Sequence, residues 1–201
     1  MPLVGKAFIL IIRDKPNINM FNHQQEAQIP IILVNQYGEK QGLSTKQAVH
    51  EKGLLHLAFS VFIRHQTTGD ILLQQRAARK YHAPNLWANA CCGHPGLSSD
   101  DVIESAQNRL REEMGFMVPL KIINQFTYFH QFNDTLFEHE YDFVLEGVIN
   151  DQQFTVNPNE VQAIKWMSQD DILKDLLANP KTYAPWFSMA LNAYQGQQTS
   201  E

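Results

Sequence analysis

The stretch DDVIESAQNRLREEMG, residues 100–115, decides the fold. Val102, Ala106 and Leu110 recur every four residues, so their apolar side chains share one face of a helix. Gly115 closes the run and can adopt the left-handed backbone conformation in which many helices end. The stretch therefore predicts an amphipathic helix that packs its apolar face against the core.

Apolar and β-branched runs on both sides of this helix predict strands. The predicted strands are residues 29–34, 56–64, 71–75, 121–132, 137–148 and 160–167. Capping residues predict further helices between residues 44 and 53, 168 and 178, and 185 and 194. This order, with one helix between two groups of strands, indicates an α+β protein whose mixed β-sheet is covered by helices on both faces.

The length of 201 residues suits one compact domain, which we place at residues 29–195. Residues 15–17 and 23–28 are polar and turn-rich, and we interpret residues 1–28 as a flexible N-terminal extension outside the domain. We place a C-terminal tail at residues 196–201. We predict that residues 76–95 form a long irregular loop. Such a loop inside a compact domain usually has a function.

The net charge and the short apolar runs argue against two classes of partner. The net charge is −5, whereas a protein that binds the nucleic-acid backbone normally carries a basic stripe, so we expect no nucleic-acid partner. The apolar run of residues 7–12 is too short to cross a bilayer, so we expect no membrane partner. Cys91 and Cys92 are adjacent and cannot build a disulfide framework, which indicates a reducing compartment, the cytoplasm.

Histidines and glutamates of the types that bind divalent metals form one candidate cluster. Its members are His50, His56, His94, Glu138 and Glu140. Two of them, Glu138 and Glu140, stand two apart on a predicted strand and so point to the same face. Imidazole with carboxylate suits zinc, manganese or iron. The alternative is that these are ordinary core and surface side chains among the eight histidines of the chain.

The sequence CCGHP, residues 91–95, lies in the irregular loop. A free cysteine is most often a small buried apolar residue. A catalytic thiol instead needs a pKa adjusted by its neighbours. The spacing leaves both interpretations open.

The end of the central helix resembles a degenerate form of the Nudix motif. In the full motif, carboxylates hold magnesium against a diphosphate. Arg109 stands where a Nudix hydrolase carries a metal-binding Glu, Asn108 replaces an Arg, and Asp100 replaces an earlier Glu. Fewer carboxylates leave fewer magnesium ions to activate water, while an added arginine favours holding the diphosphate. An ordinary amphipathic surface helix could also carry this pattern.

Taken together, the residues resemble the type I isopentenyl-diphosphate delta-isomerases, a Nudix-fold family, over roughly residues 31–194. The strongest matches are LLHLAFS at residues 54–60, WANACCGHP at residues 87–95, the pair Glu138 and Glu140, and Pro185-Trp186. Their order and separation agree jointly, which is more specific than any single motif. The resemblance implies a Nudix-like fold.

The resemblance also implies the ions. One divalent ion, Mn²⁺, Zn²⁺ or Mg²⁺, falls on His50, His56, His94, Glu138 and Glu140. An Mg²⁺ ion that bridges the substrate diphosphate falls on Glu113. The basic residues that grip the diphosphate fall on Lys46, Arg76, Lys80 and Arg109.

For the reaction, the resemblance implies interconversion of isopentenyl diphosphate and dimethylallyl diphosphate in isoprenoid biosynthesis. It further implies a mechanism of protonation and deprotonation through a tertiary carbocation. The catalytic thiol maps to Cys92, the second acid/base group to Glu140, its assisting hydroxyl to Tyr128, and the aromatic ring facing the carbocation to Trp186. We expect a small-molecule substrate and a monomer or weak homodimer.

Two rival functions remain at this point. A Nudix hydrolase would share the fold and the magnesium, but Arg109 and the CCGHP sequence weigh against it. A non-catalytic metal-binding module would explain the histidines and glutamates, but not the thiol, the tryptophan and the basic residues.

Overall fold

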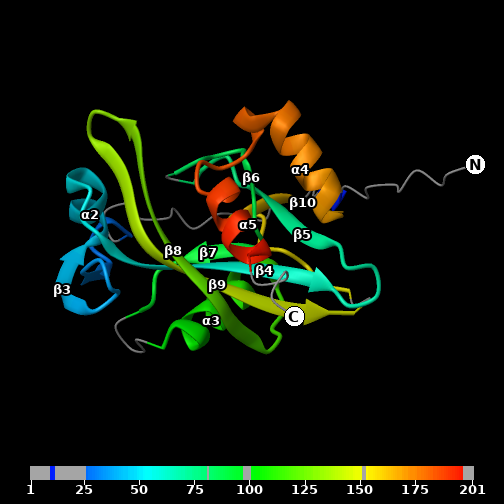
Figure 1. Cartoon of the computed structure of the whole chain (residues 1–201), viewed down its shortest axis with the longest axis horizontal. Coiled ribbons are helices and arrows are strands. Elements are labelled where there is room, and N and C mark those ends of the chain that lie inside the picture. Colours follow the sequence, from blue (N-terminus) through cyan, green and yellow to red (C-terminus); the bar gives the residue numbers. More distant parts are fainter. Residues whose placement is uncertain (1–9, 12–25, 81, 97–100, 151–152, 197–201) are drawn as a thin grey trace, which may run out of the picture.

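The computed structural model describes residues 10–11, 26–80, 82–96, 101–150 and 153–196 (Figure 1). Its strands are β1 (Leu10–Ile11), β2 (Pro30–Val34), β3 (Lys40–Thr45), β4 (His56–His65), β5 (Ile71–Arg76), β6 (Trp87–Ala88), β7 (Cys91–Gly93), β8 (Leu120–Asn133), β9 (Leu136–Ile149) and β10 (Val161–Met167). Its helices are α2 (Lys46–Lys52), α3 (Val102–Met114), α4 (Gln169–Ala178), the short 3-10 helix η1 (Pro180–Thr182) and α5 (Phe187–Gln195). Among these described helices, none is long and apolar enough to cross a membrane.

Strands β4 and β9 run parallel through the middle of the sheet, in continuous register from His56 opposite Glu140 onward (Figure 1). Strand β7 lies antiparallel to β4, with Cys92 opposite Ser60. Strands β8 and β9 form a long antiparallel hairpin. This pairing brings the cysteine loop and the strand carboxylates close to β4, although they are far apart in the sequence.

Helices cover both faces of the sheet. Phe59 and Val61 of β4 join the apolar cluster that contains Leu110 of α3. Phe62, which points the other way, joins the cluster that contains α5, where its ring stacks 4.6 Å from that of Tyr194. Burying each such side chain contributes about 1.5–3 kcal/mol. The predicted α+β sheet with helices on both faces is therefore confirmed.

Helix α3 is the helix that the stretch at residues 100–115 predicts. The Asp101 side chain accepts hydrogen bonds from the backbone N–H groups of Ile103 and Glu104, which begins the helix. Gly115 ends it with a φ of 78°. Asp100 lies outside the described residues.

Helix α2 ends in a turn that matters for the site. The Thr45 hydroxyl accepts from the N–H of Ala48 and begins the helix, while Gly53 ends it with a φ of 61°. The chain turns back at once into β4. As a result, the rings of His50 and His56 lie with their centroids 5.2 Å apart.

The predicted strands and helices are confirmed to within two residues at their ends. Strand β3 was not predicted, because its residues are mostly exposed and show no alternation of apolar and polar side chains. The loop at residues 76–95 contains the short strands β6 and β7. Within residues 1–28, Leu10–Ile11 pairs with β10, and Glu26 forms an ion pair with Lys46.

Candidate active site

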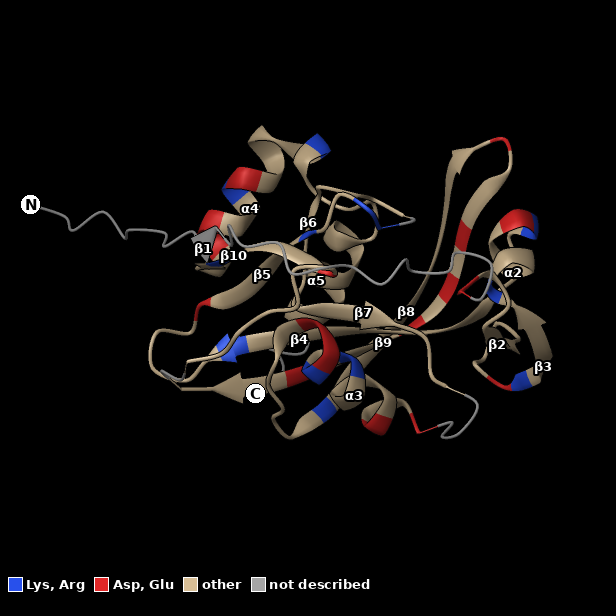
Figure 2. Cartoon of the chain, turned by 180° about the vertical axis from the view of Figure 1, so that it is seen from behind, with Lys and Arg blue, Asp and Glu red and all other residues tan. Residues whose placement is uncertain are grey.

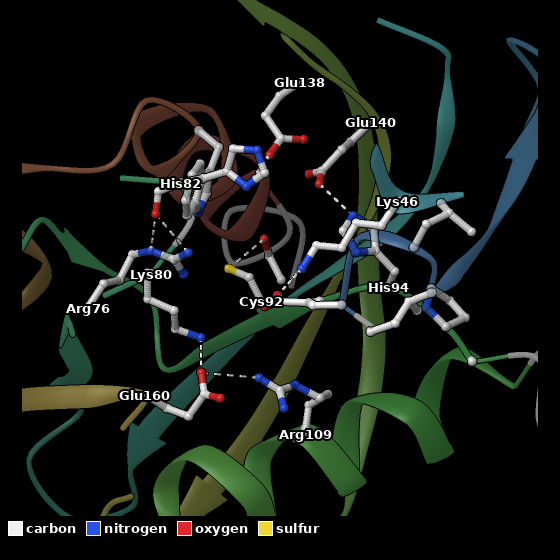
Figure 3. Close-up of a pocket in the computed structure, with 18 of the residues that line it drawn as sticks. Lys46, Arg76, Lys80, His82, Cys92, His94, Arg109, Glu138, Glu140 and Glu160 are labelled. Atoms are coloured by element: carbon white, nitrogen blue, oxygen red, sulfur yellow. Dashed lines mark hydrogen bonds and ion pairs between the residues drawn. The ribbon is translucent and has the colours of Figure 1, made fainter. Parts of the chain in front are cut away.

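A cavity of about 620 Å³ opens beside β4, β7 and β9 (Figure 3). Its lining includes ten of the predicted site residues, which are Lys46, Arg76, Lys80, Cys92, His94, Arg109, Tyr128, Glu138, Glu140 and Trp186. The other three, His50, His56 and Glu113, are fully buried and contact residues of this lining. The structure thus brings every predicted site residue to one place.

The three imidazoles and two carboxylates of the predicted metal cluster face one another. The Nε2 atom of His56 lies 3.2 Å from that of His94 and 3.8 Å from Oε1 of Glu140. Oε1 of Glu140 also lies 3.2 Å from Nε2 of His94. Nε2 of His50 lies 3.3 Å from Oε2 of Glu138. We name these five residues the His/Glu cluster.

The His/Glu cluster fits a divalent ion. His50 Nε2 and Glu138 Oε2 are buried and make no hydrogen bond, so a cation between them would satisfy both. The Nδ1 atom of His56 lies 2.8 Å from the carbonyl oxygen of Leu54, which places its proton on Nδ1 and leaves Nε2 to bind a metal. Burial, together with the neighbouring imidazoles, lowers the pKa of His56 and His94 to about 3. Both rings are therefore neutral, as metal ligands must be.

The Cys92 thiol lies in a polar setting on the cavity wall. Its Sγ atom lies 3.2 Å from Oδ1 of Asn89 and 3.7 Å from Oγ of Ser60. The Ser60 hydroxyl donates in turn to Oδ2 of Asp142 at 2.8 Å. Burial, and then the Asp142 carboxyl, raises the pKa of Cys92 to about 12, so the thiol holds its proton at neutral pH. Cys91, by contrast, is fully buried in the core on the α3 side.

The Glu140 carboxyl is held at both oxygens. The Tyr128 hydroxyl donates to Oε2 at 2.8 Å, and His94 approaches Oε1. Burial raises the pKa of Glu140 above its ordinary value. A carboxyl with a raised pKa holds a proton more readily than an ordinary carboxyl, which favours a role in proton transfer.

The Glu113 carboxyl meets the cationic side of the cavity. Its Oε1 atom lies 3.1 Å from Nζ of Lys80 and pairs with Arg109, while Gln74 donates to Oε2 at 2.9 Å. Burial by itself would raise the pKa of Glu113, but Lys80 and Arg109 outweigh it, and the net shift is downward. Glu113 is therefore an ionised carboxylate, which suits a magnesium ligand. Glu160 pairs with the same two cations (Figure 3).

The remaining cations also have partners in the structure. Lys46 pairs with Glu26. Arg76 donates two hydrogen bonds to the backbone carbonyl of His82, and its guanidinium carbon lies 5.1 Å from the centre of the Trp186 ring.

Outside the cavity, charges of both signs are interspersed over α3 and α4, and acidic segments lie along the β8–β9 hairpin (Figure 2).

Several site residues were missed in the sequence. They are Glu26, Ser60, His82, Asn89, Asp142 and Glu160. Asp142 carries a usable signal, because it continues the alternate-residue series of Glu138 and Glu140 on one strand. His82 lies in the loop that was predicted to be functional. Glu160 carries no local signal, since only the fold brings it to Lys80 and Arg109.

Comparison with known proteins identifies the family. A model of the NUDIX domain matches residues 54–187. The isopentenyl-diphosphate Delta-isomerase of Aliivibrio fischeri is 42% identical over 163 residues, which cover 78% of this chain and 90% of that protein. The chain belongs to the isopentenyl-diphosphate Delta-isomerase family. Isopentenyl-diphosphate Delta-isomerase 2 of Photorhabdus laumondii is 39% identical, covering 85% of this chain and 95% of that protein.

Solved structures agree with the fold of this family. A crystal structure of a Deinococcus radiodurans protein covers 82% of this chain and 99% of its own, with a TM-score of 0.65 and 20% identity. The MutT protein of Methanosarcina mazei covers 73% and 96%, with a TM-score of 0.58 and 16% identity. At these identities the likeness shows the fold alone. The predicted family and its Nudix fold are confirmed.

Proposed function

We propose that this chain interconverts isopentenyl diphosphate and dimethylallyl diphosphate, the reaction that gives its family its name, by proton addition and proton removal. The observation that carries the proposal is that a protonated thiol, Cys92, and a held carboxyl, Glu140, line the same cavity. The cationic side chains that fit a diphosphate line that cavity too.

The chemistry requires one proton to arrive and another to leave. In the forward direction a proton adds to the terminal methylene carbon of the substrate, which leaves a tertiary carbocation. Loss of a proton from the carbon two bonds away, next to the one that bears oxygen, then forms the new double bond. Cys92 and Glu140 are the groups that give and take these protons, and their roles exchange when the direction is reversed.

The neighbours of these two groups fit the same roles. The Tyr128 hydroxyl donates to Glu140 and holds the carboxyl in place. Trp186 lines the same cavity, and its ring lies 5.1 Å from the Arg76 guanidinium, which supports its assignment as the aromatic ring that would face the carbocation. Such a contact with a desolvated carbocation is worth about 2 kcal/mol. The acid and the base must therefore supply most of the remaining rate enhancement.

We assign the diphosphate to the cationic side of the cavity. Lys46, Arg76, Lys80 and Arg109 would clamp it, and Glu113 would hold a bridging Mg²⁺. The His/Glu cluster would hold a second divalent ion, Mn²⁺, Zn²⁺ or Mg²⁺, which when bound would supply positive charge beside Glu140 and adjust its acidity. The diphosphate is bound but not cleaved. Its binding energy positions the small hydrocarbon part of the substrate for proton transfer.

The free thiols of Cys91 and Cys92 support a reducing compartment, the cytoplasm, as the site of this reaction, with a small molecule as its substrate. The hydrolase alternative differs in the bond that it breaks, because it would attack phosphorus with water. Arg109 stands where that chemistry needs a carboxylate and is paired with Glu112 and Glu113 in this structure.

Incubation with isopentenyl diphosphate and Mg²⁺ in heavy water tests the proposal. We expect dimethylallyl diphosphate that carries solvent deuterium, detected by mass spectrometry and NMR, with no release of phosphate. Phosphate release from this substrate or from nucleoside diphosphate derivatives would support a hydrolase instead. Tight metal binding without any product would support a non-catalytic module.

A further inference from the structure

His82 is a histidine beside the His/Glu cluster that has no role in the proposed reaction. It lies in the loop between β5 and β6 and lines the cavity with only 7% of its surface exposed. Its ring centroid lies 4.6 Å from that of His50. Figure 3 shows its imidazole turned toward Glu138.

The two oxygens of Glu138 divide between two sets of neighbours. Oε2 faces the cluster, 3.3 Å from Nε2 of His50 and 3.9 Å from Nε2 of His56. Oε1 faces Nδ1 of His82 at 3.5 Å. A carboxylate with its second oxygen held from outside can present its first oxygen in a fixed direction, and such outer partners are common at metal sites.

The backbone around His82 is also held firmly. Arg76 donates from both Nε and Nη2 to its carbonyl oxygen, at 3.2 and 3.1 Å. The next residue, Ala83, has a φ of 46°, a conformation that residues with a Cβ rarely adopt. The surrounding contacts must impose this conformation, so the backbone that carries His82 is held in one arrangement.

We propose that His82 is a positioning residue of the metal centre, which donates its Nδ1–H to Oε1 of Glu138 and so directs Oε2 at the ion. This inference rests on the metal centre of the proposed function. It assigns to His82 an effect on metal affinity that acts through Glu138, without a bond from His82 to the ion.

Binding of Mn²⁺, measured by competition with a chelator, tests this role without any need for turnover. His82→Ala should weaken Mn²⁺ binding about 10–100-fold, the usual effect of removing an outer partner of a metal ligand. His82→Asn should restore most of the affinity, because the side-chain amide of asparagine offers an N–H close to the position of Nδ1. Thermal unfolding checks that each variant is folded.

His130→Ala is the matched control. The ring of His130 contacts Phe132, as does that of His82, but it is half-buried on β8 and lies outside the cavity lining. This variant should bind Mn²⁺ like the wild type, which would exclude a general effect of losing an imidazole.

Three results would overturn the inference. Undiminished Mn²⁺ affinity in His82→Ala would show that Glu138 needs no such partner. Equal weakening in His82→Asn and His82→Ala would show that an N–H donated to Glu138 is not what supports the ion. A wild-type chain that binds no Mn²⁺ would overturn the metal centre, and only that result would also count against the proposed function.

Discussion

Asp142 shows how the site depends on single residues that have no part in the proposed proton transfer. It lies two positions after Glu140 on β9, is 1% exposed, and accepts a hydrogen bond from Ser60. Burial, and then the charge of Glu140, raises its pKa well above the ordinary value. The hydrogen bond from Ser60 to Asp142 fixes the Ser60 oxygen 3.7 Å from the Cys92 sulfur, where it restricts the orientation of the thiol.

Ser60→Ala should therefore lower the rate of the chemical step. The hydrogen bond from Ser60 to Asp142, which fixes the serine oxygen beside the thiol, contributes about 0.5–1.5 kcal/mol, so we expect kcat to fall by up to about tenfold while KM changes little. Steady-state kinetics with isopentenyl diphosphate measures both. An unchanged kcat would show that Ser60 does not position the thiol.

Ser168→Ala is the control for lost stability. This serine caps α4 by accepting from the N–H of Asp171, and its removal costs about 1 kcal/mol. Because it lies outside the cavity lining, its kcat should equal that of the wild type. An equal fall in kcat for Ser168→Ala would show that lost stability explains the effect of Ser60→Ala.

At the scale of elements, the sequence predicts those parts whose local pattern agrees with their packing. Helix α3 has a cap, an apolar face and a terminal glycine, and its bounds are correct to within two residues. Strand β3 has no such pattern, because its pairing with β2 rather than burial holds it in place. The pairing of Leu10–Ile11 with β10 is equally invisible in the sequence, since a short apolar run does not say which strand it will join.

Gly115 offers a test of how α3 is ended. A Cβ at this position would lie 2.1 Å from the carbonyl oxygen of Thr155, and the backbone is left-handed with a φ of 78°. Gly115→Ala should lower the free energy of unfolding by more than the roughly 1–2 kcal/mol that a left-handed residue with a Cβ costs. Denaturant unfolding measures the change.

Gly69→Ala separates the two contributions. Gly69 has a similar φ of 75°, but a Cβ there would meet no atom within 4 Å. Gly69→Ala should therefore lower the free energy of unfolding only by the roughly 1–2 kcal/mol that a left-handed residue with a Cβ costs. Equal losses for the two variants would show that the close approach of Thr155 to α3 does not contribute.

At the scale of the whole molecule, the parallel pairing of β4 and β9 and the docking of β7 on β4 assemble the site. The His/Glu cluster, the thiol and the cations could be predicted from the sequence. Motifs that match a family in order and separation identify the positions of its site residues along the chain. The partners that hold them, such as His82 and Glu160, could not be predicted, because only the folded sheet and its loops bring them into contact.

The most direct test compares Cys92→Ala with Cys91→Ala in heavy water. Both variants remove one thiol, but only Cys92 lines the cavity, whereas Cys91 is buried in the core. We expect Cys92→Ala to lose at least about 10²-fold in deuterium incorporation, the usual contribution of a proton-transferring group, while Cys91→Ala retains it. Full turnover by folded Cys92→Ala would contradict the account.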